Sequence, residues 1–220
     1  MTLPASLKDR VLEAAKREPS ETRAQHQTKA IRALAVGTAV ALFILFVTGG
    51  PELGRRPAAL LVTTALILAA LATAMTVLAV RGFGKSMTGA SSETLITAAL
   101  ISAPAMWLVE LGARLVWPPT MIRHSSVQST IICHVCTLAM ALGPMIALIR
   151  IRRNSDPVHP RAFGAALGAA AGAWGAVLID LHCASNDMQH IALGHLLPTA
   201  VLAVIGAVVG AKSLSLGAAH

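Results

Sequence analysis

The sequence predicts an all-α fold, a bundle of six transmembrane helices preceded by a short cytosolic amphipathic helix. The first observation is composition: 55% of the 220 residues are hydrophobic and only 13% are charged, with a mean hydropathy of +0.68. That balance is typical of polytopic membrane proteins and lies outside the usual range of soluble domains. The second is order along the chain, because the sequence after Lys29 is a succession of apolar runs separated by short polar breaks.

Six apolar runs are long enough to cross the roughly 30 Å hydrocarbon core of a bilayer, which takes about 20 helical residues. The breaks between them contain Gly, Pro, Ser or charged residues, as loops require. The predicted spans cover residues 31–48, 57–80, 95–117, 130–151, 162–182 and 191–211. We therefore predict a membrane domain over 30–212, between an N-terminal segment, 1–29, and a short tail, 213–220.

The distribution of Lys and Arg predicts that both termini face the cytoplasm. With six spans, the two tails and alternate loops share one side of the membrane, and that side holds 14 of the 18 Lys and Arg residues. The other four are Arg55, Arg56, Arg114 and Arg123. Positive residues concentrate on the cytoplasmic side of membrane proteins. The topology therefore accounts for the net charge of +8, and we predict no direct binding of nucleic acid.

The segment 1–29 contains a predicted amphipathic helix. Ser6 and Asp9 form a capping-box pattern at its start, and Pro19 ends it after about three turns. A helix this short is marginally stable alone, so its apolar stripe needs a surface to cover it. The bilayer, the protein's own loops and a partner protein would each serve, and the acids on the polar face slightly favour a partner. The candidate partner-binding residues are Leu7, Val11, Leu12 and Ala15.

Cysteines and histidines gather at the predicted outer face. Span four begins there with a C-x-x-C motif, and span five ends there with His-Cys. Thiolate and imidazole suit zinc or copper(I), two thiols suit a redox disulfide, and small cysteines also simply pack in helical bundles. These three interpretations stay open, although without a second C-x-x-C the motif alone does not indicate a closed structural zinc site. The candidate sensor cysteines are Cys133, Cys136 and Cys183, and the candidate metal ligands are these three with His182, His190 and His195.

Two acidic residues, Glu110 and Asp180, fall within the predicted spans. Charges inside a bilayer are costly and usually face the bundle interior or a wet cavity. Arg114, one helical turn from Glu110, is a plausible ion-pair partner, and this structural role is as well supported as a functional one. Glycines spaced four apart in spans five and six predict close helix packing, within one chain rather than between copies.

The sequence resembles the NrsF-like family of integral-membrane anti-sigma factors, and in particular its myxobacterial members that control carotenoid synthesis in response to light. The resemblance rests on LKDRVLEAAKREPS near the start, the span-four cysteine, RIRRNSDPVHP, GAALGAAAGAWGA, LHC and GHLLP. It implies a non-enzymatic protein of the bacterial inner membrane that holds an extracytoplasmic-function sigma factor away from RNA polymerase. An envelope, light or oxidative signal would release the sigma factor. The cytosolic H-x-x-x-C-x-x-C motif of zinc-containing anti-sigma factors is absent.

Two other functions compete with this interpretation. A membrane thiol oxidoreductase would use Cys133 and Cys136, but such enzymes usually need a second cysteine pair and only Cys183 remains. A transporter or metal permease would need polar residues through the bilayer centre, and the inner halves of the spans are almost purely apolar. No cofactor is predicted, apart from a metal ion at the outer Cys/His group.

Overall fold

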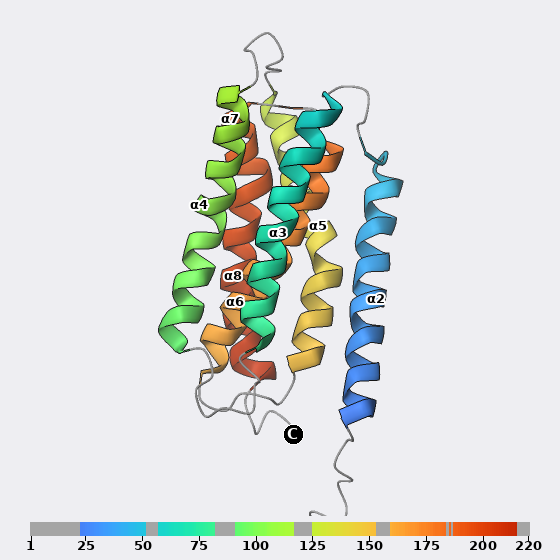
Figure 1. The fold of residues 1–220 in the computed structure, drawn as a ribbon, viewed down its shortest axis with the longest axis vertical. Helices are drawn as coiled ribbons and strands as arrows, with labels where there is room; N and C mark the ends of the chain where they lie inside the picture. Colours follow the sequence, from blue (N-terminus) through green and yellow to red (C-terminus); the bar gives the residue numbers. More distant parts are fainter. Residues whose placement is uncertain are drawn as a thin grey trace, which may run out of the picture.

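The computed structural model describes residues 23–51, 57–81, 91–116, 125–152, 159–183, 185 and 187–214, and in these residues it is helical with no strand (Figure 1). Six helical segments are long and apolar enough to cross a membrane, which confirms the predicted fold class. The first five are α2 (Arg23–Val47), α3 (Ala58–Arg81), α4 (Ser92–Val116), α5 (Val127–Arg152) and α6 (Pro160–His182). The sixth is built from α7 (Met188–His190), the π-helical segment η2 (Ile191–Leu196) and α8 (Leu197–Ser213).

Helix α2 begins at Arg23, ahead of the predicted start of the first span at residue 31. The exposed Gln25, Gln27 and Thr28 lie in these two extra turns. Hydropathy marks only the part of a helix that lies in hydrocarbon, whereas backbone hydrogen bonding continues into the headgroup region and water. The predicted amphipathic helix with Leu7, Val11, Leu12 and Ala15 lies outside the described residues.

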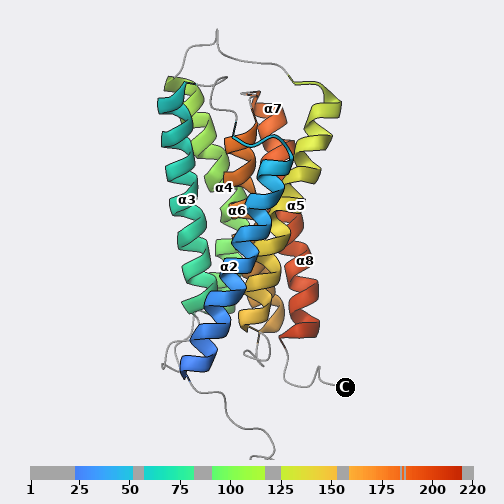
Figure 2. The ribbon, with the colours of Figure 1, turned by 90° about the vertical axis from the view of Figure 1, so that its right-hand side faces the viewer.

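The start of α2 and the end of α8 lie at the same end of the bundle, the lower end in Figures 1 and 2. An even number of spans requires this arrangement. It agrees with the even number of spans that the sequence predicts. The start of α5 and the end of α6 lie at the opposite end (Figure 2), where the sequence predicts the Cys/His group.

Helix α6 is the centre of the bundle. Within an 18-residue apolar stretch of its span 83% of the residues are buried, against 17–44% for such stretches in the other five. Alanine and glycine dominate it, so the surrounding helices approach closely and pack against a narrow cylinder. Large apolar residues such as Phe43, Leu100 and Val204 lie exposed on the outer helices, where a bilayer would solvate them.

Glycines make the contact between α6 and α8. A Cβ atom at Gly168 would overlap the Leu202 carbonyl group, and one at Gly206 would overlap the carbonyl of Gly164. Backbone therefore lies against backbone along this pair of helices, as small residues four apart permit. The predicted close packing is found within one chain.

Helix α2 lies at the periphery and packs chiefly against α5. The two helices approach most closely where Gly37 faces Gly143, because a Cβ at Gly37 would come within 2.7 Å of the Gly143 carbonyl oxygen. Figure 2 shows α2 crossing the front of the bundle at an angle to α5. The buried residues of α2, Gly37, Ala41 and Leu45, thus lie between its middle and its end at Val47.

The end of α2 at Val47 is closed by a Schellman motif. Gly50 N–H donates to the Leu45 carbonyl at 2.8 Å, and Gly49 N–H donates to that of Phe46 at 3.2 Å. Gly49 and Gly50 have φ values of +125° and +73°, which side chains with a Cβ rarely adopt. This turn presents the Gly50 carbonyl to His182, whose Nδ1 donates to it at 2.9 Å.

Candidate functional site

Four of the predicted site residues converge at the end of the bundle where α5 begins and α6 ends. The ligand atoms of Cys133, Cys183, His190 and His195 all lie within 4.8 Å of one another. Three separate stretches of chain bring them together: α5 carries Cys133, Cys183 caps the end of α6, and the two histidines stand on α7 and η2. We call these four residues the Cys/His cluster.

The cluster is compact and largely closed to solvent. The Sγ atoms of Cys133 and Cys183 are 3.8 Å apart, and Cys183 Sγ is 3.2 Å from His190 Nε2. Cys183, His190 and His195 are buried, while Cys133 is half-buried. The His190 and His195 rings pack edge to face with centroids 5.2 Å apart.

The π-helical segment η2 is what places both histidines in the cluster. Residues five apart lie about 140° apart around an α-helix, on different faces. The wider i→i+5 bonding of a π-helix brings such residues toward one face, and short π segments are frequent at functional sites. His190 and His195 are five apart and flank this segment.

Pro198 explains why the helix changes its hydrogen bonding here. It has no N–H to donate to the Gly194 carbonyl, and Leu197 N–H bonds to Ala192 rather than to Leu193. Two side chains of α5 compensate for these losses. His134 Nδ1 donates to the Leu193 carbonyl at 2.8 Å. The Thr137 hydroxyl donates to the Gly194 carbonyl at 3.0 Å.

Replacing Thr137 with valine is expected to lower the free energy of unfolding by about 1–3 kcal/mol, because it leaves the buried Gly194 carbonyl without this donor. Thermal unfolding of the full-length protein in detergent, followed by circular dichroism, measures the loss. The matched control is Thr73→Val, since the exposed Thr73 hydroxyl bonds only within its own helix at Ala69. Equal losses for the two variants would show that the Thr137 contact has no special role.

Thr130 fixes the orientation of the His190 ring. The Thr130 hydroxyl lies 3.1 Å from the Ser126 carbonyl oxygen and 3.0 Å from His190 Nδ1. Nε2 of the same ring is left to face Cys183. Such a hydrogen bond to the outer ring nitrogen is the usual support of a histidine that binds a metal.

The surroundings of Cys183 lower the pKa of its thiol. The hydrogen bond from the Cys133 thiol lowers the pKa of Cys183; burial opposes that shift, and the bond with His190 adds to it. The Ser185 backbone N–H also points at Cys183 Sγ, at 3.4 Å. Nucleophilic attack, disulfide exchange and metal binding all use the thiolate.

Cys136 and His182, two further candidates from the sequence, are not among the four clustered residues. Cys136 lies one turn along α5 and packs beside Leu45, Met140 and Ile179. His182 bonds to Gly50 at the end of α2. Cys133 is thus paired with Cys183 across the bundle rather than with its C-x-x-C neighbour.

Sequence reasoning missed the supporting residues Thr130 and Thr137. Pro198 was a usable signal for Thr137, since a proline within a span frees carbonyl groups that neighbouring side chains must satisfy. No comparable sequence signal points to Thr130.

The two intramembrane acids are both buried. Asp180 on α6 accepts a hydrogen bond from the Thr64 hydroxyl of α3 at 3.2 Å. Glu110 is 4% exposed on α4, and the side chain of its predicted partner Arg114 lies outside the described part of the chain. Both acids face the bundle interior, and neither belongs to the Cys/His cluster.

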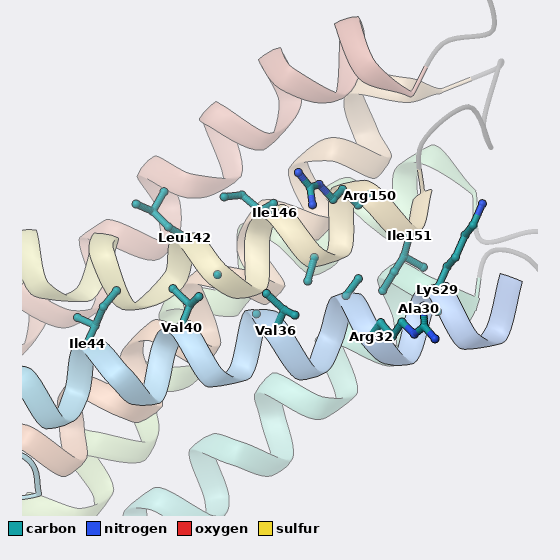
Figure 3. Close-up of a pocket in the computed structure, with 14 residues that line it drawn as sticks. Lys29, Ala30, Arg32, Val36, Val40, Ile44, Leu142, Ile146, Arg150 and Ile151 are labelled. Atoms are coloured by element: carbon teal, nitrogen blue, oxygen red, sulfur yellow. The ribbon is translucent and has the colours of Figure 1, made fainter. Parts of the chain in front are cut away.

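At the opposite end, a groove of about 920 Å³ opens between α2 and α5. Figure 3 shows Val36, Val40 and Ile44 of α2 on one wall and Leu142 and Ile146 of α5 on the other. Three exposed basic side chains lie at the end of the groove nearer the start of α2, at the right in Figure 3: Lys29, Arg32 and Arg150. Apolar walls and a cationic end are what a groove at a cytoplasmic membrane surface would present.

A comparison with protein-family models decides the family. The model described as "Negative regulator of sigma F" matches residues 14–215. The chain belongs to the NrsF family. Membership makes it a negative regulator of a sigma factor, and it confirms the family resemblance found in the sequence. Neither a curated protein nor a solved structure matches the chain. The closer likeness of this NrsF-family protein to carotenogenesis regulators stays a prediction.

Proposed function

We propose that this NrsF-family protein is an anti-sigma factor of the bacterial inner membrane. It binds an extracytoplasmic-function sigma factor on the cytosolic side, keeps it from RNA polymerase and releases it when a signal reaches the outer face. It acts as a binding and regulatory protein, with no catalysis of its own. The observation that carries the proposal is that a six-helix bundle of this family has both described ends at one end of the molecule.

The cytosolic output is assigned to the segment that precedes α2. Its apolar stripe of Leu7, Val11, Leu12 and Ala15 needs a covering surface, and a sigma factor supplies one. Because this segment runs directly into α2, any movement of α2 reaches it. The basic end of the groove, with Lys29, Arg32 and Arg150, stands beside the same junction.

The input is assigned to the Cys/His cluster. Its two thiols are close enough to each other to form a disulfide when oxidised or to bind one metal ion together, and Cys133 is partly exposed. His182 precedes Cys183 in the chain and bonds to Gly50 in the turn that closes α2, so one residue links the cluster to the output helix. Oxidative, light-generated and other envelope signals all act through chemistry that such a group supports.

The test is co-purification. Tagged full-length protein in nanodiscs is expected to capture one extracytoplasmic-function sigma factor when each such factor of the host is co-expressed with it. A variant lacking residues 1–22 keeps α2 and the membrane domain and is expected to capture far less. If the full-length protein captures no sigma factor from the set, the proposed function is wrong.

A further inference from the structure

We infer that Cys133, Cys183, His190 and His195 form a binding site for one Zn²⁺ ion in the outer half of the bundle. Two thiolates and two imidazoles are a donor set of structural zinc sites, which are almost always tetrahedral. The ligands come from three parts of the chain, so the site is not the C-x-x-C site that the sequence motif suggests. The inference concerns the protein's input and stands independently of whether a sigma factor binds at the other end.

The spacing of the donor atoms fits that geometry. With Zn–S bonds of about 2.3 Å, two sulfurs of a tetrahedral site lie about 3.8 Å apart, and a sulfur and a nitrogen about 3.5 Å apart. The sulfurs of Cys133 and Cys183 are 3.8 Å apart, and Cys183 Sγ is 3.2 Å from His190 Nε2. No pair among the four exceeds 4.8 Å, so a small closure of the side chains completes the shell.

His195 gives an independent indication of a ligand. Its Nε2 is buried and makes no hydrogen bond within the described residues. The residue is only 2% exposed, so solvent does not satisfy that nitrogen. A buried polar atom without a partner is costly. A metal ion among the four donors would remove that cost.

The charges favour zinc over copper(I). Zn²⁺ with two thiolates and two neutral imidazoles carries no net charge, which suits a buried site in a membrane protein. Cu⁺ in the same shell would leave one negative charge. Binding displaces the protons of the two thiols to solvent. Thr130 lies beside His190 Nδ1, and Nε2 of the same ring already faces Cys183.

The full-length protein in nanodiscs, without any sigma factor, is expected to bind one Zn²⁺ per chain. Chelator competition measures its affinity, and Co²⁺ in its place is expected to give the absorption of a tetrahedral site with two thiolates. Cys183→Ser and His195→Ala should each weaken Zn²⁺ binding by more than about 100-fold, and Thr130→Val by about 10–100-fold. Cys136→Ser and His182→Gln are the matched controls, and both should bind as the wild type does.

A second measurement uses only the wild-type protein and so does not depend on how the variants fold. Zn²⁺ is expected to slow alkylation of Cys183 and Cys133 and to leave that of Cys136 unchanged. The inference is overturned by zinc binding that is absent, by equal losses in the control variants, or by a Cys133–Cys183 disulfide in the protein as isolated. Binding of Cu⁺ without Zn²⁺ would overturn the choice of ion. None of these readouts depends on the anti-sigma activity, so the two proposals fail separately.

Discussion

Replacing Gly168 with leucine is expected to destabilise the bundle by more than about 3 kcal/mol, the upper end of ordinary overpacking costs. A Cβ at this position already overlaps the backbone carbonyl of Leu202. Backbone yields less readily than the end of a side chain, so α6 and α8 must separate to admit even one methyl group. Because α6 is the central helix, that separation affects the packing of every neighbour. Thermal unfolding in detergent, with monodispersity checked by gel filtration, measures the effect.

Gly112 provides the matched control. It lies in α4, and a Cβ there meets nothing within 4 Å. Gly112→Leu is expected to be tolerated, and Gly112→Ala to stabilise the helix by about 0.5–1 kcal/mol through better helix propensity. Gly168→Ala should fall between the wild type and Gly168→Leu. Similar melting temperatures for the Gly168 and Gly112 leucine variants would contradict the close backbone contact between α6 and α8.

Replacing both Leu7 and Val11 with aspartate is expected to release the sigma factor without any signal. The two residues lie on one face of the predicted N-terminal helix, so the double change removes its apolar surface and adds two charges. Loss of a binding hot spot costs about 2 kcal/mol or more, equivalent to roughly 30-fold in affinity. A reporter driven by a promoter of the bound sigma factor should then rise at least about tenfold in uninduced cells.

The control for this experiment changes the polar face of the same helix. Arg10→Ala with Lys16→Ala preserves the apolar stripe and should leave the reporter low. Quantitative immunoblotting of the membrane fraction establishes that each variant is present at the wild-type level. A reporter that stays low in the aspartate variant, at normal protein level, would remove these residues from the proposed sigma-factor interface.

The spans were predictable because the membrane imposes a simple requirement. Each crossing needs about 20 apolar helical residues, and only that requirement was needed to find six. The ends were less predictable, as α2 shows by starting at Arg23 in a polar stretch. The burial of Arg152 beneath Phe163, with its guanidinium carbon 4.6 Å from the ring centroid, also has no signature in hydropathy. It depends on how the ends of α5 and α6 meet.

That the site residues gather at one end of the bundle was predictable, but which of them lie against one another was not. Topology alone placed Cys133, Cys183, His190 and His195 at one end of the bundle. Whether Cys133 or Cys136 faces Cys183 depends on how α5 is rotated about its own axis. Packing against the neighbouring helices sets that rotation. Bringing His190 and His195 to one side needs the π-helical turn, and regular helical periodicity predicts the opposite.

The contact between Gly37 and Gly143 has a mechanical consequence for α2. At 1.5 Å per residue, Gly37 lies about 15 Å from the outer end of the helix at Val47 and about 21 Å from the inner end at Arg23. If α2 turns as a rigid body about this contact, its two ends move in opposite directions. A sideways shift at the Val47 end, where His182 bonds to Gly50, then produces a shift about 1.4 times larger at the Arg23 end. The position of Gly37 thus sets both the point about which α2 turns and the factor by which a shift at one end is enlarged at the other.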